Sequence, residues 1–440
     1  MEISFIILQI LKSWWWFFLS VILWFLAKSL YLWWIRWEVW YKKNKWILLE
    51  IKPPEENLKP FSAMEDIFTL FWSFYDVPVL KQAWCEGEFP HFPFWFTCEI
   101  VGIGGKVHFY MRILEEWKSS VESTIYSHYP DVEISVVEDY TKKVPQNIPN
   151  EKWNLYGEDF TLLKDDIYPI MTYSMFFEKP EEEKRVMEEK RIDPLNSLLE
   201  GLSQLQLGEQ FWFQIGVIPI LDKDIPIFSR GKALANKLAK RPETKKPKGI
   251  LQETAEILIS GKTAEEPEKE AGFIAPELRL TSGEKEILKG IETKISKYCF
   301  NCWIKILYLC KTDEPFNWGN YKMGRTYLQH FATSNMNGIR FASEARTKIH
   351  YWLRDRRLYL RKRRHLRYYV ERLPLSFPWN LEGRVIYPPF YPRSGIKRTA
   401  FVLNAEELAS IFHFPPKVIL PGVSRVEVKK AGPPSGLPTE

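Results

Sequence analysis

Cysteine is scarce in this sequence, with five residues in 440, and histidine is nearly as rare, with seven. The cysteines are odd in number and scattered, which argues against a disulfide framework and favours a reducing compartment. No histidine has the spacing of a metal site or an obvious serine or cysteine nucleophile as a partner. We therefore expect no catalytic centre, no cofactor and no metal, and predict that the protein is not an enzyme.

A nucleotide-binding loop is also missing. Ser260-Gly-Lys-Thr263 ends like a phosphate-binding loop, but that motif needs a glycine where this chain has Glu256, and it needs a preceding strand. Cys299 and Cys302 have the spacing of half a zinc site or of a redox pair, yet no second ligand pair accompanies them. We interpret both as small core residues.

Charge is absent from residues 14–27, within an almost wholly apolar run from Ile3 to Ile35. Its length predicts a transmembrane helix, rather than a buried helix or a cleaved signal peptide. Two tryptophan clusters lie about twenty residues, or about 30 Å, apart, which is one hydrocarbon thickness. Lys12 or Lys28 must then reach toward the headgroups, so the register is open by about one or two turns. The predicted anchor residues are Trp14, Trp15, Trp16, Trp24, Trp33 and Trp34.

Basic residues follow the apolar run, whereas only Glu2 and the amino terminus precede it. Positively charged flanks stay on the cytoplasmic side of a membrane. We therefore expect a single-pass protein with its N-terminus outside and its body in the cytoplasm. The basic flank consists of Arg36, Lys42, Lys43, Lys45, Lys52 and Lys59.

The fold class predicted for the body is α+β, with two ferredoxin-like β-α-β-β-α-β modules after an anchor and juxtamembrane segment at 1–45. Apolar patterning places the first module at 46–145, with a Gly104-Gly105 hairpin turn. Its strands are expected at 46–52, 92–103, 106–113 and 132–138, and its helices at 61–74 and 115–128.

The second module is predicted at 146–340, with a flexible, charge-rich insertion at about 221–276 in its hairpin. We expect the segment 318–334 to be helical. The module's strands are expected at 159–164, 210–220, 278–280 and 302–310, and its two helices at 193–205 and 282–297.

The last hundred residues divide into a basic helix at 341–373 and a C-terminal part at 374–440. The C-terminal part is predicted to hold a proline-rich arm, a short strand at 401–403, a helix capped by Asn404 and a tail.

The basic helix is the strongest functional signal. Between Arg346 and Arg372 lie eleven basic residues and two acidic ones, a net charge of +9, whereas the rest of the chain carries −3. Arginine forks and interleaved aromatic rings suit nucleic acid. They also suit an anionic lipid surface, at about 1 kcal/mol per basic side chain, or an acidic protein partner. The candidate binding residues are Arg354, Arg356, Arg357, Arg361, Lys362, Arg363, Arg364 and Arg367.

The C-terminal block carries a family resemblance. Residues 401–415, FVLNAEELASIFHFP, with 423–430 and 433–438, resemble the segment that precedes the motor domain in type IV secretion and conjugation ATPases and their HerA/FtsK-like relatives. The whole chain also resembles an uncharacterised bacterial family of membrane-anchored proteins, through 101–110, VGIGGKVHFY, and 129–133, YPDVE. The resemblance implies a partnership with a P-loop ATPase, but it supplies no catalytic residue for this chain.

Two functions are therefore predicted. The first is a membrane-anchored scaffold or accessory component of a DNA- or protein-translocating machine, whose motor is a separate chain. The alternative is a membrane-tethered nucleic-acid-binding protein that acts through the basic helix.

Overall fold

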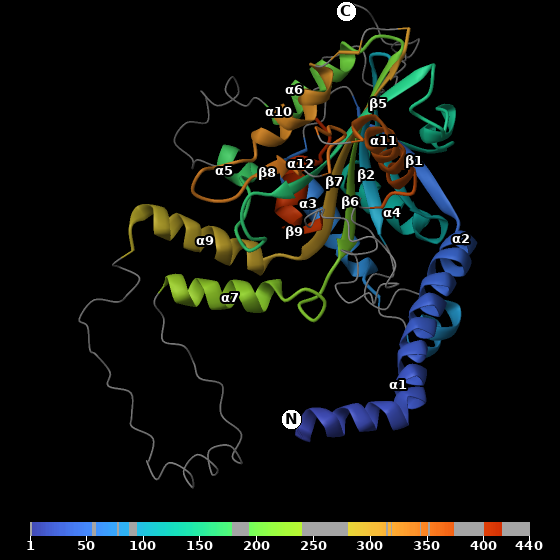
Figure 1. Cartoon of the computed structure of the whole chain (residues 1–440). Coiled ribbons are helices and arrows are strands. Elements are labelled where there is room, and N and C mark those ends of the chain that lie inside the picture. The colour runs from blue at the N-terminus through green and yellow to red at the C-terminus, as the bar shows by residue number, and fades with distance from the viewer. Residues whose placement is uncertain are drawn as a thin grey trace, which may run out of the picture.

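The computed structural model describes most of the chain (Figure 1). The Gly-Lys-Thr segment at 260–263, most of the predicted strand at 278–280, the proline-rich arm and the tail lie outside the described residues. The residues that the structure describes are 2–54, 59–76, 79–87, 95–177, 193–239, 280–313, 316–317, 319–343, 345–350, 353–373 and 400–415.

The N-terminal helix α1 spans Glu2–Trp34 and bends at Trp14, whose φ of −114° and ψ of 17° are not helical. Figure 1 shows the stretch before this bend lying crosswise to the rest of the helix. Between Lys12 and Leu32 the helix is long and apolar enough to cross a membrane, and the described part of the body buries none of its most apolar window. A π-helical turn, η1 (Ile35–Trp40), and a short helix, α2 (Tyr41–Lys43), lead into the body.

One antiparallel sheet forms the centre of the body, in the order β4-β1-β3-β2-β6-β7-β5-β8. β9 pairs with the first part of β7 (Cys299–Trp303), and β5 pairs with its last part (Lys305–Lys311). The strands are β1 (Trp46–Lys52), β2 (Phe96–Ile103), β3 (Lys106–Leu114), β4 (Glu133–Val137), β5 (Trp153–Leu162), β6 (Glu209–Pro219), β7 (Cys299–Lys311), β8 (Ile339–Phe341) and β9 (Ala400–Asn404).

The strands of the first half match the predicted element order. β2 and β3 form a hairpin through Gly104 and Gly105, whose φ values of +54° and +83° favour glycine. β2 also pairs with β6, from Phe96 opposite Val217 to Ile103 opposite Gln210. This pairing joins the strands of the two predicted modules into one continuous sheet.

Both faces of the sheet are covered, which explains why its central strands are largely apolar on both faces. In β7, Ile304 and Ile306 pack into the larger core on one face, and Leu307 and Leu309 pack into a second core on the other. The larger core is closed by α3 (Phe61–Phe71), α4 (Lys118–His128), α6 (Pro194–Ser203), α10 (Met323–Gln329) and α12 (Ala405–Ile411). The second core includes residues of α11 (Arg354–Val370).

The predicted assignment of elements in the second half was wrong in one respect. After β7 the chain continues through η7 (Asn320–Lys322) and α10 to β8, which pairs with β5. The helix α9 (Ser282–Ser296) instead packs beside α7 (Ile227–Leu238), and its C-terminal end contacts β9 through Lys294 (Figure 1). The two helices share a small core of their own, to which Ala235, Leu288 and Ile291 contribute.

The segment predicted as an insertion begins with a helix, because residues 227–238 form α7. Ile227, Gly231 and Ala235 lie four residues apart and are buried, whereas Lys232 and Lys237 are exposed. The polar residues of this segment therefore lie on the solvent side of an amphipathic helix.

The helix predicted at 341–373 is shorter in the structure, because α11 begins at Arg354 and ends at Val370.

Gly216 of β6 allows the closest side-chain packing in the sheet. It lies opposite Trp303 of β7, and a Cβ added there would lie 2.0 Å from the indole ring. We expect Gly216→Val to lower the free energy of unfolding by about 3 kcal/mol, because Trp303 is buried and cannot move aside. Chemical denaturation of the detergent-solubilised full-length chain would measure this.

The matched control is Gly283→Ala, where an added Cβ meets nothing within 4 Å in the first turn of α9. This change is expected to leave stability unchanged or raise it by up to about 1 kcal/mol. Equal effects of the two substitutions would contradict the packing described for Gly216.

Candidate functional site

The helix α11 has a buried and an exposed face. Its sequence contains no glycine or proline and is rich in arginine and leucine, which favour helix. His365, Leu366, Tyr368 and Tyr369 are buried against the sheet and the adjoining loops. The arginines that follow the helical period on the opposite side face solvent. One element thus carries both core residues and a basic surface.

The eight predicted binding residues do not form one surface. Arg361 donates to the Arg346 carbonyl, Lys362 donates to Asn154 Oδ1 over 2.6 Å, and the guanidinium of Arg364 lies 5.3 Å from the centre of the Tyr368 ring. These three are half-buried, and burial lowers the pKa of Lys362. The exposed members are Arg354, Arg356, Arg357, Arg363 and Arg367.

The exposed arginines surround an apolar and aromatic centre. Leu360 and Tyr359 are also exposed, and Arg363 Nη1 donates to the Tyr359 hydroxyl over 3.1 Å. Arg356, Leu360, Arg363 and Arg367 are spaced four, three and four residues apart, which places them on one helical stripe. We call these exposed residues, with Arg357 and Tyr359, the basic face.

A buried histidine fixes the middle of α11. His365 Nε2 donates to the Ala345 carbonyl, while Nδ1 lies 3.6 Å from Asp159 Oδ1 of β5. Burial, with the nearby positive charge of Lys305, lowers the pKa of His365 to about 3. The imidazole is therefore neutral near pH 7, and its contact with Asp159 is not an ion pair.

Lys305 of β7 lies fully buried beneath the end of α11. Its ammonium donates to the Leu373 carbonyl over 2.6 Å and lies 5.8 Å from the centre of the Tyr368 ring. Burial lowers the pKa of Lys305 to about 8, and Asp159 only partly offsets this. The sheet thus carries a positive charge directly under the helix, on an ammonium group that loses its proton more readily than an ordinary lysine.

The strongest attachment is a guanidinium just beyond α11. Arg372 donates from Nε to Glu99 Oε1 of β2 over 3.0 Å, and from Nη1 to Asp139 Oδ2 over 2.5 Å. Nη1 also donates to the Val370 carbonyl, and Nη2 donates to Asp139 Oδ1 and, at 3.4 Å, to Glu99 Oε2. All five N–H groups therefore have acceptors. The side chains of Arg372 and Glu99 are 1% and 0% exposed.

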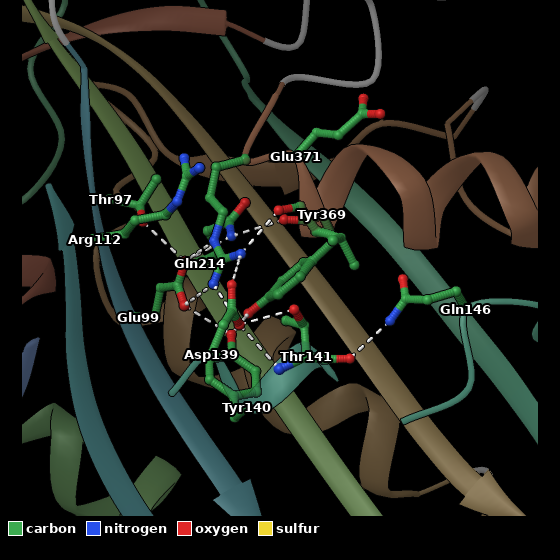
Figure 2. A network of polar contacts seen from close by, with 12 residues as sticks. Thr97, Glu99, Arg112, Asp139, Tyr140, Thr141, Gln146, Gln214, Tyr369 and Glu371 are labelled. Atoms are coloured by element: carbon green, nitrogen blue, oxygen red, sulfur yellow. Dashed lines mark hydrogen bonds and ion pairs between the residues drawn. The ribbon is translucent and has the colours of Figure 1, made fainter. Parts of the chain in front are cut away.

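Neutral donors complete the coordination of Glu99. Thr97 and Gln214 donate to Oε1 over 2.8 and 2.9 Å, and Tyr140 donates to Oε2 over 2.8 Å. Figure 2 shows Glu99, Asp139, Tyr140 and Gln214 converging on one another between the strands and the helix. We call this group, with Arg372 and Tyr369, the Arg372 network.

The charges of the Arg372 network reinforce each other. Burial raises the pKa of Asp139, but Arg372 and two hydrogen bonds from Thr141 outweigh it, so the pKa falls below its ordinary value. Burial opposes the charge of Arg372, but Glu99 and Asp139 outweigh it and raise its pKa. Arg372 also has a φ of +55°, which is unfavourable outside glycine. The ion pairs hold it in this conformation.

The segment that follows the apolar helix is hydrogen-bonded to two residues next to this network. Tyr41 of α2 donates to the Glu371 carbonyl over 3.1 Å and accepts from Arg112 Nη2 over 3.3 Å. Its ring stacks on Trp95 at an angle of 6°. The end of the apolar helix and the end of α11 are thus tied to the same point of the sheet.

The residues behind the family resemblance have structural roles. Asn404 caps α12 in a capping box with Glu407, as the sequence predicted for the cap. Glu407 pairs with Lys294 of α9 at 3.0 Å, and both side chains are 0% exposed. Lys294 also donates to the Val402 carbonyl. Residues 400–415, the described part of this block, belong to the folded body and are held by β7, α3 and α9.

The two cysteines with metal-like spacing lie on opposite faces of β7. Cys302 belongs to the larger core, and Cys299 packs against a smaller cluster that contains Trp303. Burial raises the pKa of Cys299 to about 12, so its thiol stays protonated. Within the described parts of the chain, no three metal-ligating side chains cluster together.

The predicted anchor tryptophans lie along α1. Trp33 falls outside the residues whose side chains are described. Trp14, Trp15, Trp16, Trp24 and Trp34 are each at least half exposed, as expected of side chains that no part of the body covers.

Sequence reasoning missed Glu99, Asp139 and the buried role of Arg372. A signal existed for Glu99, since it interrupts the apolar strand Phe96–Ile103, as Gln214 interrupts Glu209–Pro219. A buried carboxylate requires a partner, but the sequence does not say which of many arginines supplies it. The chain matches no protein-family model and no curated protein.

We expect Arg372→Met to lower the free energy of unfolding by about 3–5 kcal/mol, because it leaves two carboxylates without their buried partner. Arg372→Lys should also destabilise the fold, since an ammonium cannot reproduce the fork geometry. The exposed Arg356→Met is the control and should shift stability by less than about 0.5 kcal/mol. Denaturant titration of the solubilised full-length chain would test the three variants, and equal effects would contradict the assigned roles.

We expect Lys305 to make the free energy of unfolding increase as the pH rises above 7. Its folded pKa of about 8 is below that of an unfolded lysine, so the unfolded state binds more protons between these values and stability rises with pH. From pH 7 to 9.5, the wild type should gain about 2 kcal/mol relative to Lys305→Met. Denaturation of both proteins at several pH values would measure the difference. Parallel pH profiles would show that Lys305 does not titrate in this way.

Proposed function

We propose that this chain is a membrane-anchored scaffold of a translocation machine of the type IV secretion or conjugation kind. In this proposal α1 crosses the membrane, its N-terminus is outside and the body is cytoplasmic. The apolar stretch Lys12–Leu32 and the basic residues that follow it support this topology.

The body, in the same proposal, is a duplicated ferredoxin-like unit. The first set of strands has the order β4-β1-β3-β2, and the second has the mirrored order β6-β7-β5-β8. Each set follows β-α-β-β-α-β if α7 and α9, with the residues between them, are an insertion in the second hairpin. The pairing of β2 with β6 then joins the units edge to edge.

The observation that carries the function is the basic face. Its arginines point away from the sheet, while the Arg372 network, His365 and Lys305 fix the helix that bears them. Among the described residues of α11, the one acidic side chain is Asp355 in the first turn. A positive surface on a rigid element suits an anionic partner. We assign that partner to the machine's separate P-loop ATPase, as the family resemblance implies.

A second candidate is nucleic-acid binding at the same face. The specific observation in its favour is the exposed Tyr359 among the exposed arginines, because bases stack on aromatic rings while arginines pair with phosphates.

Replacing Arg356, Arg357, Arg363 and Arg367 by glutamine should abolish partner binding without unfolding the body, because all four are exposed. If the scaffold function holds, a P-loop ATPase co-purifies with the wild type in mild detergent and is lost with the variant. If nucleic acid is the partner, DNA affinity falls instead, and the slope of log affinity against log salt decreases by about 3.

The control replaces Lys232, Lys237, Lys285 and Lys289, which are exposed on α7 and α9, by glutamine. It changes the net charge equally but leaves the basic face intact. The basic face is not the binding site if this control loses binding to the same degree. The scaffold proposal fails if the wild type retains no such ATPase.

A further inference from the structure

A short segment of the body runs along the end of the apolar helix. Residues Val79–Gly87 include the π-helical turn η3 (Gln82–Glu86), whose Ala83 is buried. Trp84 accepts a hydrogen bond at its carbonyl from the Tyr31 hydroxyl of α1 over 2.9 Å. A contact with the last turns of the helix thus places this segment beside the end of the apolar stretch Lys12–Leu32.

Gly87 makes the fit between the two segments close. Its φ of +82° favours glycine, and a Cβ added there would lie 2.5 Å from the Ile35 carbonyl oxygen. Backbone therefore contacts backbone at this point, and the segment has a fixed position along the helix.

Trp84 also provides a partner for a charge within the apolar stretch. The Lys28 ammonium lies 4.8 Å from the centre of the Trp84 ring. An indole face attracts a cation, and tryptophan is favoured at membrane interfaces because one end of it is apolar and the other polar. Lys28 is thereby accommodated beside a residue suited to the headgroup region.

The outer side of the segment is apolar and uncovered by the described part of the body. Leu80 is 80% exposed and Val79 is 63% exposed. On the part of α1 that Trp84 contacts, Leu30 and Trp34 are also more than half exposed. Lys81 is exposed beside them, where it can meet anionic headgroups.

We propose that Val79–Gly87 is a second membrane-contacting element, which lies in the interface of the bilayer beside the end of α1. This inference rests on the proposed membrane crossing of α1. The segment does not cross the bilayer; it inserts Val79, Leu80 and Trp84 at the boundary between headgroups and acyl chains. The body is then held by two contacts with the membrane, which fix its orientation as well as its location.

The test measures the depth of a fluorescent label in the full-length chain. The chain, with Cys85→Ser to remove the exposed cysteine, is reconstituted in vesicles of phosphatidylcholine and phosphatidylglycerol that contain nitroxide lipids. Separate samples carry Leu80→Cys, Ile22→Cys or Leu207→Cys and an environment-sensitive label. Leu207 is 90% exposed on the body, next to the β2–β3 turn, and is the matched control.

A label at position 80 that lies roughly 5–10 Å into the headgroup boundary should be quenched by shallow nitroxide lipids about threefold more than one at position 207. A label at position 22 should respond to deep nitroxides. Quenching at 22 with equal quenching at 80 and 207 overturns the interfacial element and leaves the anchor. Absence of quenching at position 22 overturns the anchor and this inference with it.

A second measurement keeps the native cysteine. With a label on Cys85, the double substitution Val79→Glu and Leu80→Glu should reduce shallow quenching to the level seen at position 207, because two carboxylates resist the interface. Both replaced residues are exposed, so the fold should be retained. Unchanged quenching of the Cys85 label would overturn the role assigned to these two side chains.

Discussion

A buried guanidinium holds the basic helix to the sheet. Arg372 forms ion pairs with Glu99 of β2 and with Asp139 of the loop after β4, and all of its N–H groups have acceptors. These partners lie far apart in sequence, so the pairing fixes a strand, a loop and the end of α11 at one point. Charged groups inside a protein are stable only with such compensation. The direction in which the basic face points follows from this constraint.

The arginines of α11, and Arg372 just beyond its end, therefore lie in three different environments. Arg372 is an interior residue, Arg361 and Arg364 rest partly on the body, and Arg356 and Arg363 face solvent. Arginine can serve in all three places because its guanidinium stays charged and its stem packs against apolar surface. Only the exposed group remains available for a partner.

The segment that links the apolar helix to the body contacts the sheet close to Arg372. Tyr41 contacts both Arg112 and the Glu371 carbonyl, so α2 and the end of α11 meet there. Together with the packing of Gly87 on Ile35, this gives the apolar helix two defined contacts with the body. In the proposed scaffold function, this fixed geometry would present a partner docked at α11 at a set position relative to the membrane.

The sequence by itself determined the apolar N-terminal helix, the α+β class, the β2–β3 hairpin at Gly104 and the cap at Asn404. Each depends on neighbours within a few residues, where periodicity and turn chemistry act. Tertiary structure alone decided that α9 packs beside α7, that β9 pairs with β7 and that Arg372 is buried while Arg356 is not. These outcomes depend on contacts between distant segments. The sequence does not distinguish one arginine of a basic run from another, because the buried carboxylate that pairs with Arg372 comes from a distant strand.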